Sequence, residues 1–125
     1  WHFGGQRYQN LVMQVDEIIK FCNKSRTGIC HDISHSYMAC NHFGWDHVKY
    51  TKDLSNYAYH YHIADAVGVD GEGLQFGKGE VSFNRILPII KKYSKNASFI
   101  PEIWQGHKND GEGFWKALKM LEDLL

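Results

Sequence analysis

The chain has 125 residues with 14 basic and 14 acidic side chains, so its formal net charge is zero when its eight histidines are neutral. This length suits one domain with one hydrophobic core, and the neutral balance does not favour binding along a nucleic-acid backbone. No apolar run approaches the roughly 18 residues that a membrane helix needs, and no signal-peptide pattern opens the chain.

The cysteines indicate the cellular compartment, and the first residue indicates whether the chain is part of a longer protein. Cys22, Cys30 and Cys40 are odd in number and have no CxxC spacing. This usage is typical of reduced thiols, so a cytoplasmic protein is expected. The chain begins with Trp1 rather than Met, which leads us to expect a portion of a longer protein.

Helices and strands are predicted to alternate along the chain, from the spacing of apolar residues. In chain order the predicted elements are a helix over 8–22, a strand over 27–33, a helix over 46–57, a strand over 58–64, a helix after Ser82, a strand over 98–104 and a helix over 110–125. Residues 34–45 and 67–79 are predicted to be loops. The order α-β-α-β-α-β-α is typical of an α/β fold with a parallel sheet, either a small layered sheet or part of a larger barrel.

Two local features refine this prediction. The first strand is mostly apolar, which suits a strand buried on both faces. Ser82 can cap the third helix. Pro88 falls inside that helix, so a kink or a later start is expected there.

Each predicted strand ends in side chains that can bind a metal. The first strand ends in Asp32 and His35, the second in His62 and the third in Glu102. Asp65 follows the second strand and His107 follows the third. The carboxyl ends of parallel strands lie at one edge of a sheet, so these groups are expected to converge. Carboxylates and imidazoles together suit Mn, Zn, Co, Fe or Mg.

Structural roles compete with this interpretation. A lone histidine near a strand end is commonly a hydrogen-bonded structural residue, and this is our interpretation of His31, His42, His47 and His60. Asp65 could equally cap a helix. Glu102 stands in the apolar run "FIPEIW", where a buried carboxylate is costly unless it is paired or binds a metal.

The glycine-rich stretch "GEGLQFGKGE" matches neither GxGxxG nor GxxxxGK[ST]. Its amides could hold an anion, or it could be a lid whose turns need positive φ. Glu72 and Gln75 could reach a polyhydroxylated substrate. The aromatic side chains of Trp104, Trp45 and Phe76 could pack on a sugar or belong to the core.

"DISH", "HIAD", the glycine segment and a late glutamate, in this order, resemble the xylose-isomerase-like TIM barrels. That superfamily contains sugar and sugar-phosphate isomerases and epimerases, inosose dehydratases and apurinic-site endonucleases. The resemblance implies that Asp32, His35, His62 and Glu102 gather at the carboxyl end of a barrel as its metal ligands. It also implies that Glu102 is an acid/base. His35 would contact a substrate oxygen more readily than the metal, together with substrate contacts from Glu72, Gln75, Trp104 and His107.

The chain also departs from the family pattern. The family's strand-four glutamate would fall just before Trp1, so residues 1–125 resemble the carboxyl-terminal half of a barrel. Ser82 stands where the family usually has aspartate in its G-x-G-x-I-D-F segment. The Asp-x-His pair of the endonuclease branch is replaced by "GEG", which disfavours a three-metal site for DNA repair.

These features together predict a sugar isomerase or epimerase with one divalent metal ion, acting by proton transfer next to a carbonyl. Its substrate is expected to be a carbohydrate, free or phosphorylated, with no nucleic acid or membrane partner. The alternatives are a metal-dependent phosphodiesterase of the abasic-site endonuclease kind and a barrel portion that binds without turnover. Three strands leave open sheet edges, so self-association or pairing with the other half of a barrel is expected.

Overall fold

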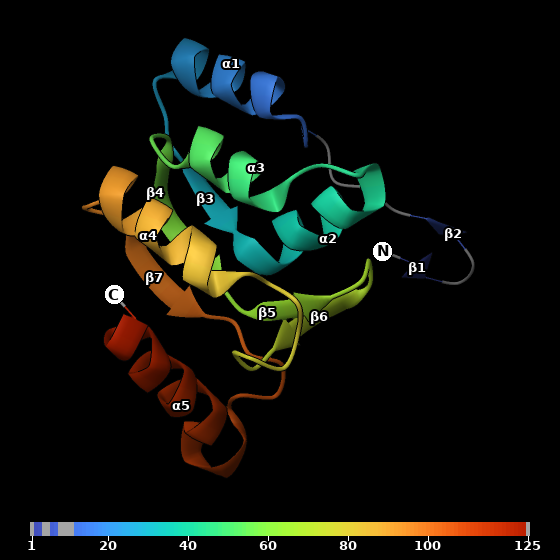
Figure 1. The fold of residues 1–125 in the computed structure, drawn as a ribbon, viewed down its shortest axis with the longest axis vertical. Coiled ribbons are helices and arrows are strands. Elements are labelled where there is room, and N and C mark those ends of the chain that lie inside the picture. The colour runs from blue at the N-terminus through green and yellow to red at the C-terminus, as the bar shows by residue number, and fades with distance from the viewer. Residues whose placement is uncertain (1, 4–5, 8–11, 125) are drawn as a thin grey trace.

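The computed structural model describes residues 2–3, 6–7 and 12–124. Its helices and strands follow one another around a central sheet, with α1 and α5 at opposite ends of the molecule (Figure 1). In chain order the elements are β1 His2–Phe3, β2 Gln6–Arg7, α1 Val15–Ser25, β3 Ile29–Asp32, α2 Ile33–Phe43, α3 His47–Leu54, β4 Ala58–Ile63, β5 Asp65–Val67, β6 Gly71–Leu74, α4 Phe83–Tyr93, β7 Ser98–Pro101 and α5 Lys108–Leu124.

The central sheet has the order β3-β4-β7, and both of its strand pairs are parallel. This confirms the predicted α/β class with a parallel sheet. The register places His31 beside Tyr61 and Tyr61 beside Phe99. Two short antiparallel pairs, β1-β2 and β5-β6, complete the strands that the structure describes.

The helices cover one face of this sheet. Tyr61 and Ile63 of β4 are fully buried, and they belong to one cluster with Ile86 and Ile90 of α4 and Leu121 of α5. Burying side chains of this size stabilises a fold by about 1.5–3 kcal/mol each. The apolar faces of α4 and α5 therefore pack against the sheet, as their amphipathic periodicity indicates.

The other face of the sheet is open in the part of the chain that the structure describes. Cys30 and Ser98 are exposed, His60 is half-buried, and Ile100 is 48% exposed. The prediction that the first strand is buried on both faces is therefore wrong. Successive side chains of a strand point to opposite faces of the sheet. Here the side chains of one face pack against helices, and those of the other face do not.

The predicted loop over 34–45 is wrong, because most of it forms α2. This helix begins directly after Asp32, which accepts a hydrogen bond from the His35 amide. It ends at Gly44, whose positive φ of 71° closes the helix in the left-handed region. The sequence of α2 lacks a clear helical spacing of apolar residues, because the helix buries Ser34 and Ser36 beside its apolar side chains.

Other boundaries also differ. The predicted helix over 8–22 begins instead at Val15, and its first residues, 8–11, lie outside the described residues. The predicted loop over 67–79 contains β6, which pairs with β5. The last strand stops at Pro101 rather than Trp104. Within α5, residues 109–111 have left-handed φ and ψ values, so the regular helix follows Gly111.

The third helix begins after Ser82, as predicted, but Ser82 caps it through its backbone carbonyl. That oxygen accepts from the amides of Arg85 and Ile86. Pro88 lies within the helix without ending it. Among the described residues, every helix is too short or too polar to span a membrane.

Candidate functional site

Asp32 stands where β3 passes into α2, and both its carboxylate oxygens are engaged. Oδ1 accepts from the His35 amide at 2.9 Å and from the Ser34 hydroxyl at 2.9 Å. Oδ2 lies 2.9 Å from Nδ1 of His35. Burial alone would favour the neutral acid, yet these hydrogen bonds lower the pKa of Asp32 to about 2. The side chain is therefore an anion at neutral pH.

His62 of β4 and Glu102, which follows β7, meet Asp32 at the carboxyl end of the sheet. Nδ1 of His62 lies 3.0 Å from Oε2 of Glu102 and 3.7 Å from Oδ2 of Asp32. Glu102 follows the last residue of β7, and its side chain is 54% exposed. The prediction that Glu102 is a buried carboxylate is therefore wrong, because the strand ends before it. The three side chains converge as the parallel topology predicted.

These three residues form a group that fits a divalent cation. One ligand atom from each of Asp32, His62 and Glu102 lies within 4.8 Å of the other two. Two carboxylate oxygens and one imidazole nitrogen suit Mn, Zn, Fe or Co, and the exposed side of Glu102 leaves access for another ligand. Divalent charge would also offset the repulsion between the two carboxylates.

His35 is placed differently from the metal ligand predicted for it. It is not a member of the three-residue group. Its Nδ1 contacts Asp32, and its Nε2 forms a short ion pair with Oε2 of Glu72 from β6. The hydrogen bond to Asp32 is the main reason why the pKa of His35 rises to about 9, with Glu72 adding to it against burial. The imidazolium of His35 thus joins α2 to the β5-β6 hairpin beside the candidate metal group.

The remaining predicted substrate contacts are not members of this group. Gln75 donates from Nε2 to the Gly113 carbonyl at 3.0 Å, which ties it to α5. Trp104 is 70% exposed, and its amide donates to the Gly73 carbonyl. His107 is exposed on the turn before α5.

Asp65 organises the segment that carries Glu72. It is 1% exposed, and its carboxylate accepts from the amides of Ala66, Gly77, Gly79 and Val81. A Cβ on Gly79 would lie 2.5 Å from Oδ1 of Asp65, so only glycine allows this approach. Asp65 is therefore a structural anchor of the hairpin. Phe76 is a core residue, and its ring centroid lies 4.7 Å from that of Phe83.

Two further histidines lie on the covered side of the sheet. Nε2 of His31 and Nε2 of His47 lie 3.1 and 3.0 Å from the same hydroxyl, Oγ of Ser36. Burial lowers the pKa of His31 to about 3 and that of His47 to about 4, so both imidazoles are neutral. Both have the hydrogen-bonded structural role that we predicted for them.

Sequence reasoning missed the neighbours of His62 on the open face. Cys30, His60 and His62 also place one ligand atom each within 4.8 Å of one another. Partial burial, and then the charge of Asp32, raise the pKa of the Cys30 thiol. The alternation of side chains along β3 and β4 could have indicated this group. Cys30 lies on the same face as Asp32, and His60 lies on the same face as His62.

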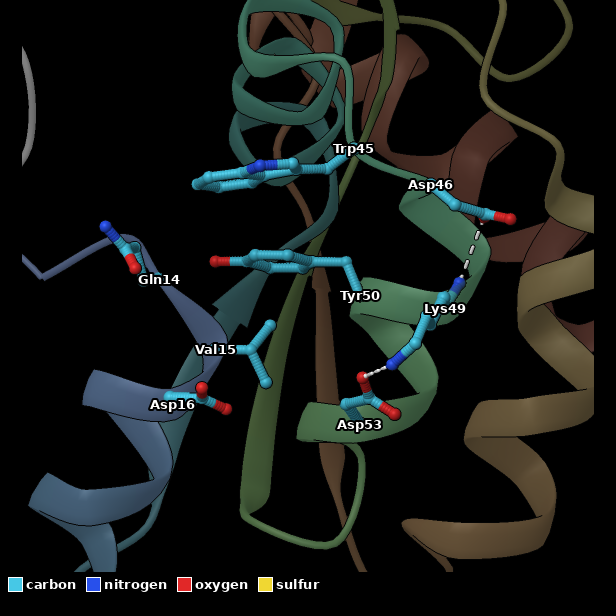
Figure 2. Close-up of a pocket in the computed structure, with 8 residues that line it drawn as sticks. All are labelled: Gln14, Val15, Asp16, Trp45, Asp46, Lys49, Tyr50 and Asp53. Atoms are coloured by element: carbon cyan, nitrogen blue, oxygen red, sulfur yellow. Dashed lines mark hydrogen bonds and ion pairs between the residues drawn. The ribbon is translucent and has the colours of Figure 1, made fainter.

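A cavity of about 500 Å³ lies beside β3, and its lining includes Cys30, Asp32 and His35 along with Met13 and Tyr50. A second pocket, of about 340 Å³, lies between the start of α1 and α3 (Figure 2). There Trp45 stacks on Tyr50 with ring centroids 6.1 Å apart. The first cavity adjoins the candidate metal group, whereas the second shares none of its residues.

One comparison with known proteins bears on this geometry. The protein-family model described as xylose isomerase-like TIM barrel matches residues 1–124. Among curated proteins, none matches the chain.

Proposed function

Since this chain belongs to the xylose isomerase-like TIM barrel family, we propose that it acts as a metal-dependent isomerase or epimerase of a sugar or sugar derivative. The observation that carries the proposal is the position of Glu102. Its carboxylate lies beside His62 and Asp32, yet more than half of the side chain is exposed at the open end of the sheet. A substrate carbon can therefore approach a carboxylate that borders a metal group.

Asp32, His62 and Glu102 would hold the ion, which when bound would polarise a carbonyl or hydroxyl oxygen of the substrate. Glu102 accepts the proton from the carbon next to the carbonyl, and the C–H electron pair moves toward the carbonyl oxygen. In isomerisation the proton then returns to the neighbouring carbon, while the hydroxyl proton on the first carbon passes to the former carbonyl oxygen. In epimerisation Glu102 releases its proton to water, and water on the opposite face gives a proton to the same carbon. Atoms and charge balance without any added oxidant or reductant.

His35 supplies a positioned N–H donor in this proposal. Its ring is oriented by Asp32 through Nδ1, and Nε2 faces Glu72. A substrate oxygen that replaces the Glu72 carboxylate would receive the Nε2 hydrogen. Orientation by a carboxylate fixes the ring and lowers the cost of this contact.

Two features support the isomerase over the phosphodiesterase. The chain carries no excess of basic residues to neutralise a phosphate backbone. The metal group in the described residues offers two carboxylates and one imidazole, which is sufficient for a single ion.

The test is solvent-deuterium exchange into a panel of free and phosphorylated aldoses and ketoses, followed by proton NMR with Mn²⁺ present. We expect exchange at the carbon next to the carbonyl with the unchanged chain. Glu102→Gln, which keeps the shape of the side chain, should reduce exchange by about 100-fold or more. Exchange retained by Glu102→Gln would remove Glu102 from the acid/base role.

A calorimetric titration of Mn²⁺ separates binding from turnover. Asp32→Asn is the matched variant, because asparagine keeps the helix cap and removes the charge. It should weaken Mn²⁺ affinity at least about tenfold. Metal binding without exchange on any substrate would instead favour a barrel that binds without turnover, and hydrolysis of an abasic-site oligonucleotide would favour the phosphodiesterase.

A further inference from the structure

The open face of the sheet carries a second group of metal-binding side chains, on the same strands as the first. Cys30 and His60 are paired neighbours in the β3-β4 ladder. His60 and His62 are two residues apart on β4, so they share a face. The strand register, and not a local sequence motif, thus brings the sulfur and the two imidazoles within 4.8 Å of one another.

This second group differs in chemistry from the carboxylate group. Cys30, His60 and His62 offer one sulfur and two nitrogens, whereas the first group offers oxygens and one nitrogen. Thiolate and imidazole ligands select borderline and soft ions such as Zn²⁺ and Co²⁺, while Mg²⁺ and Mn²⁺ prefer oxygen. Three protein ligands also leave one tetrahedral position free.

A neighbouring hydroxyl orients the His60 ring. Nδ1 of His60 lies 2.7 Å from Oγ of Ser98, its register partner on β7. A hydrogen on Nδ1 that donates to this hydroxyl leaves Nε2 unprotonated and able to bind a metal. Such partners on the second nitrogen are typical of histidines that bind metals.

We propose that Cys30, His60 and His62 form a zinc-type site that shares His62 with the carboxylate group. On binding, the Cys30 S–H bond breaks, its proton passes to solvent and the sulfur–metal bond forms. The two sites are antagonistic, because both groups include the His62 imidazole. Two divalent ions bound side by side would also repel each other. By linkage, each ion lowers the affinity for the other by the same factor. This site does not require the proposed isomerase activity.

Cobalt is the probe, because a thiolate–Co²⁺ bond gives a charge-transfer absorption band that oxygen and nitrogen ligands lack. Cys22 and Cys40 are buried and Cys30 is exposed, so the band reports this cysteine. Titration of the reduced, metal-free chain with Co²⁺ should produce the band, and Zn²⁺ should displace it. A titration without the band overturns the proposal.

Variants locate the site. Cys30→Ser should abolish the band, and His60→Asn should weaken Co²⁺ affinity at least about tenfold. His42→Asn, at an exposed imidazole on α2, is the matched control and should leave the titration unchanged. Circular dichroism checks that each variant is folded, as expected for substitutions on an exposed face. A band that persists in Cys30→Ser overturns the proposal.

Glu102→Gln distinguishes the two sites. It should weaken Mn²⁺ binding and leave the cobalt–thiolate band in place, because Glu102 belongs only to the carboxylate group. Saturation with Zn²⁺ should lower Mn²⁺ affinity more in the unchanged chain than in Cys30→Ser, where Zn²⁺ can compete only at the carboxylate group. Loss of the band in Glu102→Gln would merge the two groups into one site and overturn the proposal.

Discussion

The two faces of the central sheet are built from the same three strands, but one is buried beneath helices and the other is exposed. On the covered face, His31, Tyr61 and Phe99 lie side by side beneath the helices. On the open face, Cys30 and His60 occupy the alternate positions, with Asp32 and His62 at the carboxyl end. Each face therefore contains imidazoles, yet their surroundings are opposite.

The difference shows that burial, and not residue type, decides the chemistry of these histidines. His31 and His47 are shielded from water and share one hydroxyl, so burial keeps them neutral. His62 is half-buried and lies beside Glu102, so it can hold a cation. The covered face stabilises the fold, and the open face carries the side chains that we propose to bind metal ions.

The largest effect should come from truncating the covered face at Tyr61. Tyr61 is 0% exposed, and its hydroxyl lies 2.7 Å from Oγ of Ser94. Tyr61→Ala should lower the free energy of unfolding by about 3–5 kcal/mol through lost burial and a cavity. His60→Ala, one residue away on the open face, should change it by about 0.5 kcal/mol or less. Urea denaturation of both variants measures the contrast, and equal losses would contradict it.

Acid should destabilise the covered face. The pKa of His47 is about 4 in the folded chain against an ordinary 6.5, so the unfolded chain binds more protons between these values. Stability is present above pH 6.5 and is lost as the pH falls toward 4, by about 3 kcal/mol for His47. His31 extends the loss in the same direction. Urea midpoints between pH 7 and pH 4 measure it.

His47→Gln is the matching control for this pH dependence. Glutamine can still hydrogen-bond to Ser36 but cannot be protonated in this range, so the slope of stability against pH should become shallower. An unchanged slope would show that His47 is not the group responsible.

Ser36→Ala should cost about 2 kcal/mol of stability, because it leaves two buried imidazole nitrogens, on His31 and His47, without their partner. Ser98→Ala removes the equivalent hydroxyl partner of His60 on the open face, where water can replace it. We expect the second variant to lose about 0.5 kcal/mol or less. Similar values for the two variants would contradict the comparison.

The smallest effect concerns Asp32, which serves both α2 and the candidate site. Through the helix cap alone, Asp32→Ala should lose about 1 kcal/mol and Asp32→Asn only a few tenths; both variants also lose the ion pair with His35. Mn²⁺ affinity should fall in both variants. A stable Asp32→Asn chain with unchanged Mn²⁺ affinity would leave Asp32 with a capping role alone.

The alternation of helices and strands, and with it the convergence of Asp32, His62 and Glu102, could be predicted from the order of residues alone. This prediction was possible because parallel strands bring their carboxyl ends to one edge whatever their separation in the chain. Apolar periodicity likewise identified α4 and the later part of α5. Both signals are local, so no knowledge of long-range contacts was needed.

The other features depend on contacts between elements that form only in the folded chain. The helix α2 was not predicted, because the buried Ser36 interrupts its apolar pattern. Ser36 can be buried because its hydroxyl contacts the imidazoles of His31 and His47. The pairing of His35 with Glu72 depends on how the β5-β6 hairpin folds around Asp65. The neighbourhood of Cys30 and His60 depends on strand register. The contacts of His35 and Cys30 join residues far apart in the chain, and those of Ser36 join different elements. A pattern of residue types along the chain carries no direct record of which partner a side chain meets.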